Sequence, residues 1–201
     1  MQRFDGKKIG SCRILFFLGC AGLLLAGCAI GLSDKNSAPT ISGDRPWYDY
    51  GYYLSCLSAD SSYKVLDVDN RGGVKNGSKV QVWEFHGGQN QIWKFVPMGN
   101  GYFCIISSAN TRLSLDADIA PGFLGNGTKV QVWEYHGSDN QLWQVQIENN
   151  RQCIIRSKAN PNLTIDADIL PGGGRIFDGS KVQLWTYVGN GNQKWGLDRE
   201  N

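Results

Sequence analysis

The sequence predicts an all-β domain with internal threefold symmetry. The chain repeats itself at a period near fifty residues, each unit contains four short segments of strand length, and helical periodicity is almost absent. The repetition is plainest in three related segments, KVQVWEFHGGQNQIW (79–93), KVQVWEYHGSDNQLW (129–143) and KVQLWTYVGNGNQKW (181–195). We take the three units as residues 47–98, 101–148 and 151–198.

Residues 1–27 predict a bacterial lipoprotein signal peptide. Four basic residues precede an uncharged apolar stretch, ILFFLGCAGLLLAG, that is short for a membrane-spanning helix. The next motif, LAGC (25–28), resembles the lipobox, which implies cleavage before Cys28 and acylation of that cysteine. An ordinary signal peptide with a chance cysteine is the alternative. We therefore expect an exported protein, anchored by lipid in the bacterial cell envelope at the outer membrane or cell surface.

Residues 28–46 predict a flexible, lipidated tether, because they are small, polar and interrupted by prolines. The formal charge of the whole chain is +2, and residues 1–27 carry four basic and one acidic side chain, so the exported part is close to −1. No basic cluster remains there for nucleic acid.

The remaining cysteines, Cys56, Cys104 and Cys153, have no metal-binding spacing, and we expect at least Cys56 and Cys153 to be small buried hydrophobes.

Each unit has the same predicted order of elements. An apolar strand (LSCLS, FCIIS, CIIRS) is followed by a strand ending in Asp-x-Asp (VLDVD, LSLDAD, LTIDAD), a turn (NGSK, NGTK, DGSK), the KVQ strand, a loop and the Q-x-W strand. We expect the Asn-Gly and Asp-Gly pairs to supply the positive φ angles of tight hairpins. Asn76 and Asn126 also begin glycosylation sequons, which we interpret as turns only. The segment WYDYGYY (47–53) is expected to form the first strand and its packing.

Strand alternation separates the two tryptophans of each unit. In KVQVW, Val80 and Val82 share one face, so Trp83 lies on the other face with Gln81. In the Q-x-W strand, Trp93 shares a face with an apolar residue two positions later. We therefore predict that one tryptophan of each pair faces outward, at Trp83, Trp133 and Trp185. The second is predicted to fill the core, at Trp93, Trp143 and Trp195.

The same alternation places the first aspartate of each Asp-x-Asp strand on the outer face, at Asp67, Asp116 and Asp166. Each unit thus combines a carboxylate, an indole and an Asn-Gln loop end. An aromatic face packs on the C–H face of a pyranose, while carboxylates and amides bind its hydroxyls. The second aspartates, Asp69, Asp118 and Asp168, are expected to cap turns.

The three Q-x-W motifs, at Gln91/Trp93, Gln141/Trp143 and Gln193/Trp195, resemble the ricin B-chain type lectin domain, a β-trefoil. The resemblance covers nearly everything after the tether. It implies that Asp67, Asp116 and Asp166 accept sugar hydroxyls, that Trp83, Trp133 and Trp185 stack on the ring, and that Asn90, Asn140 and Asn192 make a second hydroxyl contact. Gln91, Gln141 and Gln193 would orient the pocket. His86 and His136 match a histidine that some members of the family use.

The chain departs from this family in two ways. Many relatives close the pocket with a disulfide, but Val65 and Phe85 occupy those positions in unit one, and the equivalent positions of the other units also lack cysteine. The third unit has Val188 in place of the histidine and a longer loop, ILPGGGRIFDG, before its hairpin turn.

The predicted function is weak, multivalent carbohydrate binding without catalysis, cofactor or metal. The sequence leaves the sugar open, with galactose and xylose among the pyranoses that fit. Glycoside hydrolysis needs two carboxylates across a cleft, whereas this chain repeats the same acid three times. One alternative is a trefoil scaffold that binds a protein partner; another is a targeting subunit for a separate polysaccharide-degrading enzyme.

Overall fold

The computed structural model describes residues 46–58, 63–119, 122–148, 151–169 and 175–200. The signal peptide, Cys28 and all of the tether except Pro46 lie outside these ranges, as does part of the long loop of the third repeat. Export and lipidation therefore stay predictions. Within the described ranges, no helix has the length and apolar character needed to cross a membrane.

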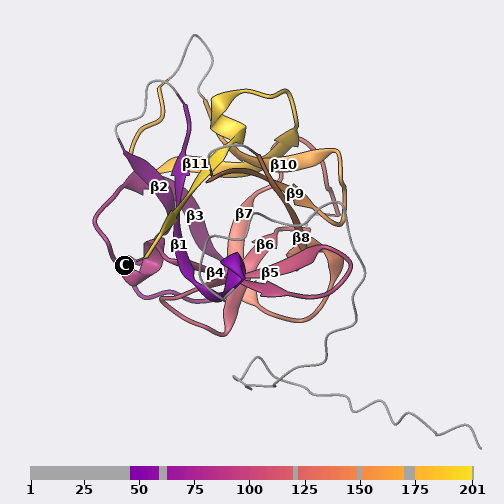
Figure 1. The fold of residues 1–201 in the computed structure, drawn as a ribbon, viewed down its shortest axis with the longest axis horizontal. Coiled ribbons are helices and arrows are strands. Elements are labelled where there is room, and N and C mark those ends of the chain that lie inside the picture. The colour runs from indigo at the N-terminus through magenta and orange to yellow at the C-terminus, as the bar shows by residue number, and fades with distance from the viewer. Residues whose placement is uncertain (1–45, 59–62, 120–121, 149–150, 170–174, 201) are drawn as a thin grey trace, which may run out of the picture. The chain divides into compact units, whose positions relative to one another are not determined.

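The described residues contain twelve β-strands, four in each repeat, which confirms the all-β prediction. In Figure 1 the three repeats follow one another around the domain, from purple through magenta and orange to yellow. Repeat one contains β1 (Gly51–Cys56), β2 (Lys64–Val68), β3 (Ser78–Glu84) and β4 (Trp93–Pro97). Repeat two contains β5 (Tyr102–Ser107), β6 (Leu113–Ala117), β7 (Val130–Glu134) and β8 (Trp143–Ile147). Repeat three contains β9 (Gln152–Ser157), β10 (Leu163–Ala167), β11 (Ser180–Thr186) and β12 (Trp195–Arg199).

The first and last strands of the repeats close into a six-stranded barrel. β1 pairs with β4 and β12, β5 pairs with β4 and β8, and β9 pairs with β8 and β12, all antiparallel. Every one of these six strands therefore has two barrel neighbours, and closure removes the exposed edges that an open sheet would present.

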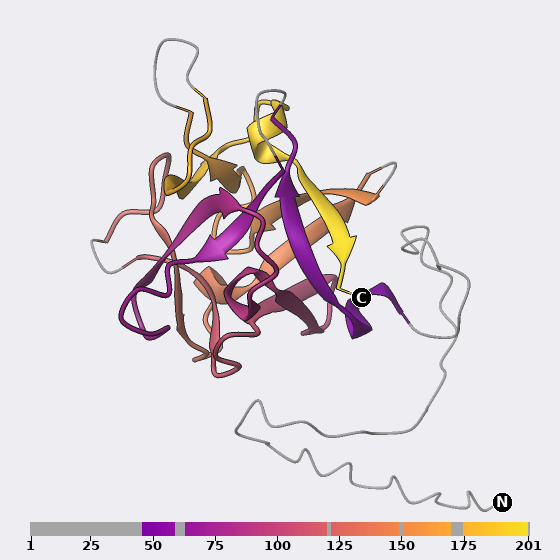
Figure 2. The same cartoon turned by 90° about the vertical axis from the view of Figure 1, so that its left-hand side faces the viewer.

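The middle strands of the repeats form three hairpins, β2–β3, β6–β7 and β10–β11, each paired over five residues. The hairpins meet one another, because β3 pairs with both β7 and β11, and a single bridge joins Lys129 to Gln183. In Figure 2 the hairpin β2–β3 lies to one side of the long antiparallel pair β1–β12. A barrel with three such hairpins is the β-trefoil architecture.

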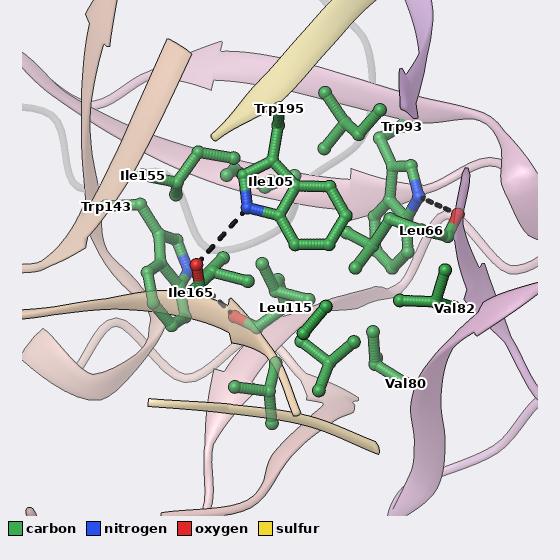
Figure 3. Packing of buried hydrophobic residues seen from close by; sticks show 14 of the residues in the cluster. Leu66, Val80, Val82, Trp93, Ile105, Leu115, Trp143, Ile155, Ile165 and Trp195 are labelled. Carbon is green, nitrogen blue, oxygen red and sulfur yellow. Dashed lines mark hydrogen bonds between the residues drawn. The ribbon is translucent and has the colours of Figure 1, made fainter. Parts of the chain in front are cut away.

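Three symmetry-related tryptophans fill the centre, as predicted (Figure 3). Trp93, Trp143 and Trp195 have no exposed surface. Each indole Nε1–H donates to a carbonyl oxygen of the Asp-containing strand of its own repeat, at 2.9 Å to Leu66, 3.1 Å to Leu115 and 3.2 Å to Ile165. A buried indole with its N–H paired combines a large apolar contact area with full hydrogen-bond satisfaction.

Two local predictions hold only in part. Trp47–Asp49 forms a 3₁₀ turn, η1, and β1 begins only at Gly51. Trp47 instead packs its ring against Tyr52, Phe95 and Phe103. In the hairpin turns only the glycine has positive φ (82°, 92° and 86° at Gly77, Gly127 and Gly179), so the preceding Asn or Asp has another role.

Cys56, Cys104 and Cys153 are buried, and none of the three forms a disulfide. Burial raises the pKa of the Cys56 thiol to about 11. Burial also raises the pKa of the Cys153 thiol, so Cys56 and Cys153 are protonated at neutral pH and serve as small apolar side chains, as predicted.

Candidate functional site

The candidate site of each repeat lies on its hairpin. In repeat one, Asp67 on β2 is directly opposite Gln81 on β3, and Val65 is opposite Trp83. Residues two apart on a strand share a face, so Asp67 and Trp83 are diagonal neighbours on the face away from the core. The same register places Asp116 opposite Gln131 and diagonal to Trp133, and Asp166 opposite Gln183 and diagonal to Trp185.

The outward tryptophans are partly exposed. Trp133 and Trp185 are 40% and 38% accessible, and Trp83 is partly buried. The turn glycine of a neighbouring hairpin lies close to two of these rings: a methyl group on Gly77 would lie 3.6 Å from Trp133, and one on Gly179 would lie 3.7 Å from Trp83. The prediction that one tryptophan of each pair faces outward and the other fills the core is confirmed.

A pair of amides holds each carboxylate. The Asp67 Oδ1 accepts from Gln81 Nε2 at 3.0 Å, and Oδ2 accepts from Asn90 Nδ2 at 2.8 Å. The Asn90 amide also donates to the Val68 carbonyl at 3.1 Å. The equivalent bonds in the other repeats join Asp116 to Gln131 and Asn140 (3.1 and 2.9 Å), and Asp166 to Gln183 and Asn192 (3.3 and 2.9 Å).

The carboxylates are more buried than we expected. They lie on the predicted face, but Asp67, Asp116 and Asp166 are only 2%, 3% and 4% accessible. Burial raises the pKa of Asp67 and Asp116, while hydrogen bonds from Gln81 and Gln131 oppose the rise. Burial raises the pKa of Asp166 further, to about 6, with the nearby charge of Asp168 acting in the same direction.

The two histidines lie at the first two carboxylates. His86 Nε2 is 3.6 Å from Asp67 Oδ2, and His136 Nε2 is 3.9 Å from Asp116 Oδ2. Both imidazoles are nearly half exposed, so each forms a rim above a buried carboxylate. Val188 occupies this position in repeat three and is 62% exposed, so Asp166 has no histidine at its rim.

Gln91, Gln141 and Gln193 are scaffold residues and are too buried to contact a ligand. Each has no exposed surface. The Gln91 amide donates to the Glu84 carbonyl at 2.9 Å and accepts from the His86 N–H at 2.9 Å, and the other two glutamines repeat this arrangement. These bonds fix the loop between the outward tryptophan and the asparagine. They hold the site wall in the place where many relatives of the family have a disulfide.

Sequence reasoning left Gln81, Gln131 and Gln183 out of the site. Their parity with the outward tryptophans places them on the site face, and their position opposite the aspartate makes them its nearest cross-strand partner. The alternation that places these glutamines beside the tryptophans can be read from the KVQVW motif. The pairing register, which makes the aspartate their cross-strand partner, cannot be read from the sequence.

The site carboxylates and asparagines can form further hydrogen bonds to a ligand. A carboxylate offers about four lone-pair positions, and the two amides use two of them. In repeats two and three, the Oδ1 atoms of Asn140 and Asn192 have no partner within the described residues. A planar indole beside acceptors and an amide is suited to a ligand that has one apolar face and a row of hydroxyls. The described residues contain no group of three or more His, Cys, Asp or Glu side chains placed to hold a metal ion.

Comparison with family models identifies the domain. A model described as "Ricin-type beta-trefoil lectin domain-like" matches residues 47–133, and one described as "Ricin-type beta-trefoil lectin domain" matches residues 104–201. The chain therefore belongs to the ricin-type β-trefoil lectins, and carbohydrate binding is the activity that this domain class supports. No curated protein sequence matches the chain significantly.

Solved structures agree with this assignment. The designed threefold-symmetric protein ThreeFoil is 28% identical, with a TM-score of 0.63 over 74% of this chain and 97% of its own. An exo-β-1,3-galactanase from Clostridium thermocellum is 28% identical, with a TM-score of 0.62 over 75% of this chain and 30% of its own. A ricin B-like lectin from Macrolepiota procera, solved with lactose, shares the fold at 20% identity, with a TM-score of 0.58 over 75% of this chain and 95% of its own.

Proposed function

We propose that the protein is a non-catalytic, multivalent lectin that binds pyranose sugars at three related sites, each formed by an aspartate, an outward tryptophan and an asparagine. The observation that carries the proposal is the threefold recurrence of one arrangement. In every repeat the asparagine amide donates both to the aspartate carboxylate and to the carbonyl of the next residue, with all six distances between 2.8 and 3.1 Å.

The arrangement suits a sugar in which adjacent hydroxyls share one edge. The carboxylate accepts charge-assisted hydrogen bonds, which are about twice as strong as neutral ones. The indole covers the C–H face of the ring. Galactose-type sugars are the first probes we would use, because the Macrolepiota lectin was solved with lactose and an earthworm R-type lectin domain with GalNAc. Xylose-type sugars are the second choice.

Each site is expected to bind weakly, and the three sites together more tightly. A shallow monosaccharide site of this kind has a dissociation constant on the order of 1 mM. Engagement of one polymer or glycosylated surface by two or three sites adds roughly 10²- to 10⁴-fold in avidity. The proposed lipid anchor at Cys28 would array many copies in the cell envelope and extend this effect.

The absence of catalysis is part of the proposal. A glycosidase needs an acid and a nucleophile or base about 5–10 Å apart across the scissile bond. Here each site repeats one carboxylate, and the second aspartate has another role: Asp69 accepts from the Arg71 backbone N–H at 3.1 Å and from the Arg71 guanidinium at 2.7 and 2.9 Å. Three equivalent sites of one composition are typical of binding.

Glycan binding by the combined variant Asp67→Ala, Asp116→Ala and Asp166→Ala tests this proposal. Loss of a charge-assisted hydrogen bond costs about 1.5–3 kcal/mol, or roughly 10- to 100-fold per site, so binding should become undetectable. The matched control is Asp69→Ala, Asp118→Ala and Asp168→Ala, which removes the same charge two residues later and should bind as the parent does. A folded site variant that binds as well as the control would contradict the proposal.

A further inference from the structure

An apolar hollow lies beside the carboxylate site of the second repeat. Its volume is about 360 Å³, within the roughly 300–1,000 Å³ common for small-molecule sites. The loop after β6 supplies half of the lining residues, Ile119, Gly122, Phe123 and Leu124, and the turn after β9 adds Ala159. The hollow is mainly apolar.

The hollow shares Asn140 with the candidate site. Asn140 lines it, and the same amide donates to Asp116 Oδ2 at 2.9 Å. The other polar side chains at the hollow are engaged: Ser138 Oγ lies 3.1 Å from His136 Nδ1, and Asp139 forms an ion pair with Lys158 at 2.8 Å. The surface that is left to meet a ligand is therefore apolar.

Phe123 is the main exposed surface of this wall, and it is peculiar to the second repeat. Its side chain is 58% exposed, and Ile119 beside it is 45% exposed. The hairpin turns of the three repeats align at Asn76, Asn126 and Asp178. Three residues before these positions, the repeats have Gly73, Phe123 and Arg175. The trefoil fold therefore does not require an aromatic residue here.

The backbone beneath Phe123 is matched to its ring. A methyl group on Gly125 would lie 2.5 Å from Phe123 Cζ, so only glycine lets the ring lie down over the turn. Gly125 does not have positive φ, so conformational need does not explain this glycine. The other repeats have Lys75 and Phe177 at this position. Gly125 thus serves to seat the Phe123 ring.

We propose that the second site binds a glycan of at least two linked pyranose rings, with the terminal ring at Asp116, Trp133 and Asn140 and the C–H face of the next ring on Phe123. The proposal rests on the proposed function. A pyranose offers a C–H face that can pack on the Phe123 ring. Because Asn140 belongs to both the hollow and the site, a ring in the hollow can be linked directly to the ring at Asp116. The second site should therefore prefer disaccharides over monosaccharides, whereas the first and third sites should not.

The experiment isolates the second site in the variant Asp67→Ala, Asp166→Ala. Methyl β-galactoside and lactose are titrated against it, with methyl β-xyloside and xylobiose as a parallel pair. One disaccharide should bind about 5- to 30-fold more tightly than its monosaccharide. Phe123→Ala should remove that preference and leave the monosaccharide affinity within about twofold. Phe177→Ala, which removes a side chain that is 54% exposed in repeat three, should leave both affinities unchanged.

Two further measurements keep the outcome clear. Gly125→Ala should displace the Phe123 ring and reduce the preference without removing an aromatic residue. In the unmutated chain, nuclear Overhauser contacts should join the Phe123 ring to protons of the second sugar. Equal affinities for the monosaccharide and the disaccharide of each pair would overturn this inference, as would a disaccharide preference that survives Phe123→Ala. In either case, monosaccharide binding would still support the lectin assignment. Failure of all four sugars to bind the unmutated chain would contradict the proposed function for these sugars.

Discussion

Each site carboxylate is held between two amides before any ligand arrives. The amides of Gln81 and Asn90 fix the orientation of Asp67, and His86 stands at its rim. Because these donors are already in place, a sugar adds its hydroxyls to a fixed acceptor and does not have to order it, which reduces the entropic cost of binding.

The pH dependence of binding should differ among the three sites. The raised pKa of Asp166, about 6, means that this carboxylate takes up a proton as the pH falls through 6 and loses its strength as an acceptor. Binding of hydroxyl donors needs the charged form, so affinity at the third site should drop about tenfold between pH 7.5 and pH 5, one unit below the pKa.

Titration of two single-site variants measures this difference. Asp67→Ala, Asp116→Ala retains the third site, and Asp116→Ala, Asp166→Ala retains the first, where His86 favours the carboxylate form of Asp67. The first site should lose less affinity than the third over the same pH range. The expectation fails if the first site is the more acid-sensitive of the two.

The scaffold role of Gln91 predicts a large loss of stability on its removal. Gln91→Ala leaves the Glu84 carbonyl and the His86 N–H without their partner, which should lower the free energy of unfolding by about 2–4 kcal/mol. Gln89→Ala, two residues earlier and exposed, should change it by less than about 0.5 kcal/mol. Urea denaturation of both variants measures the difference, and similar stabilities would show that the buried amide does not hold the loop.

Single residues were predictable where strand alternation decides their environment. The parity of KVQVW and of QIWKF placed both tryptophans of a pair correctly, because a strand has only two faces. Parity gives a face but says nothing of what covers it. The burial of Asp67 results from Gln81 across the hairpin and Asn90 from a loop, so it depends on pairing register and loop path.

At the scale of elements, the hairpin turns join the repeats to one another. Asn76 Oδ1 accepts from the Glu134 N–H in repeat two at 2.8 Å, Asn126 Oδ1 accepts from the Thr186 N–H in repeat three at 2.7 Å, and Asp178 Oδ1 accepts from the Glu84 N–H in repeat one at 2.8 Å. This is the role of the turn residue that we had expected to supply positive φ. A sequence read one repeat at a time could not reveal it, since the partner is always in the next repeat.

One of these three turns carries a charge. Asp178 also pairs with Lys64 Nζ at 2.5 Å, and the Lys64 side chain is 11% accessible. The register aligns Lys64 with Leu113 and Leu163, and the turn residues that reach those two positions from the preceding repeat are the neutral Asn76 and Asn126. A buried cation and an aspartate therefore stand where the two equivalent positions have a leucine and an asparagine.

This exchange predicts a compensating double variant. Asp178→Asn keeps the acceptor for Glu84 but leaves the Lys64 ammonium without its carboxylate, which should lower the free energy of unfolding by about 1–3 kcal/mol. Lys64→Leu with Asp178→Asn recreates the arrangement of the other repeats and should recover most of that loss. Thermal and urea unfolding compare the two, and a double variant no more stable than Asp178→Asn would refute the compensation.

At the scale of the whole molecule, the threefold repetition both builds the fold and multiplies the site. One repeat cannot close a barrel, because its first and last strands pair with strands of its neighbours. The period and the strand count were readable from the sequence, since each repeat carries its own pattern. The order of the barrel strands and the contacts between hairpins arise only when the three repeats assemble.

The repeats have nevertheless diverged at their sites. The first two have a histidine at the rim, the third has Val188 at that position, and the second has Phe123 beside an apolar hollow. Under the proposed function, three unequal sites on one domain would contact different sugars of a heterogeneous glycan surface at once. Avidity would then arise without high affinity at any one site.

The most direct test of the account follows the tryptophan indole N–H signals by nuclear magnetic resonance while a binding glycan is added. The signals of Trp83, Trp133 and Trp185 should shift with ligand concentration. Those of Trp93, Trp143 and Trp195, whose N–H groups are bound to carbonyls in the core, should stay in place. Saturable binding that leaves the three outward indoles unmoved would contradict the assignment of the ligand to these sites.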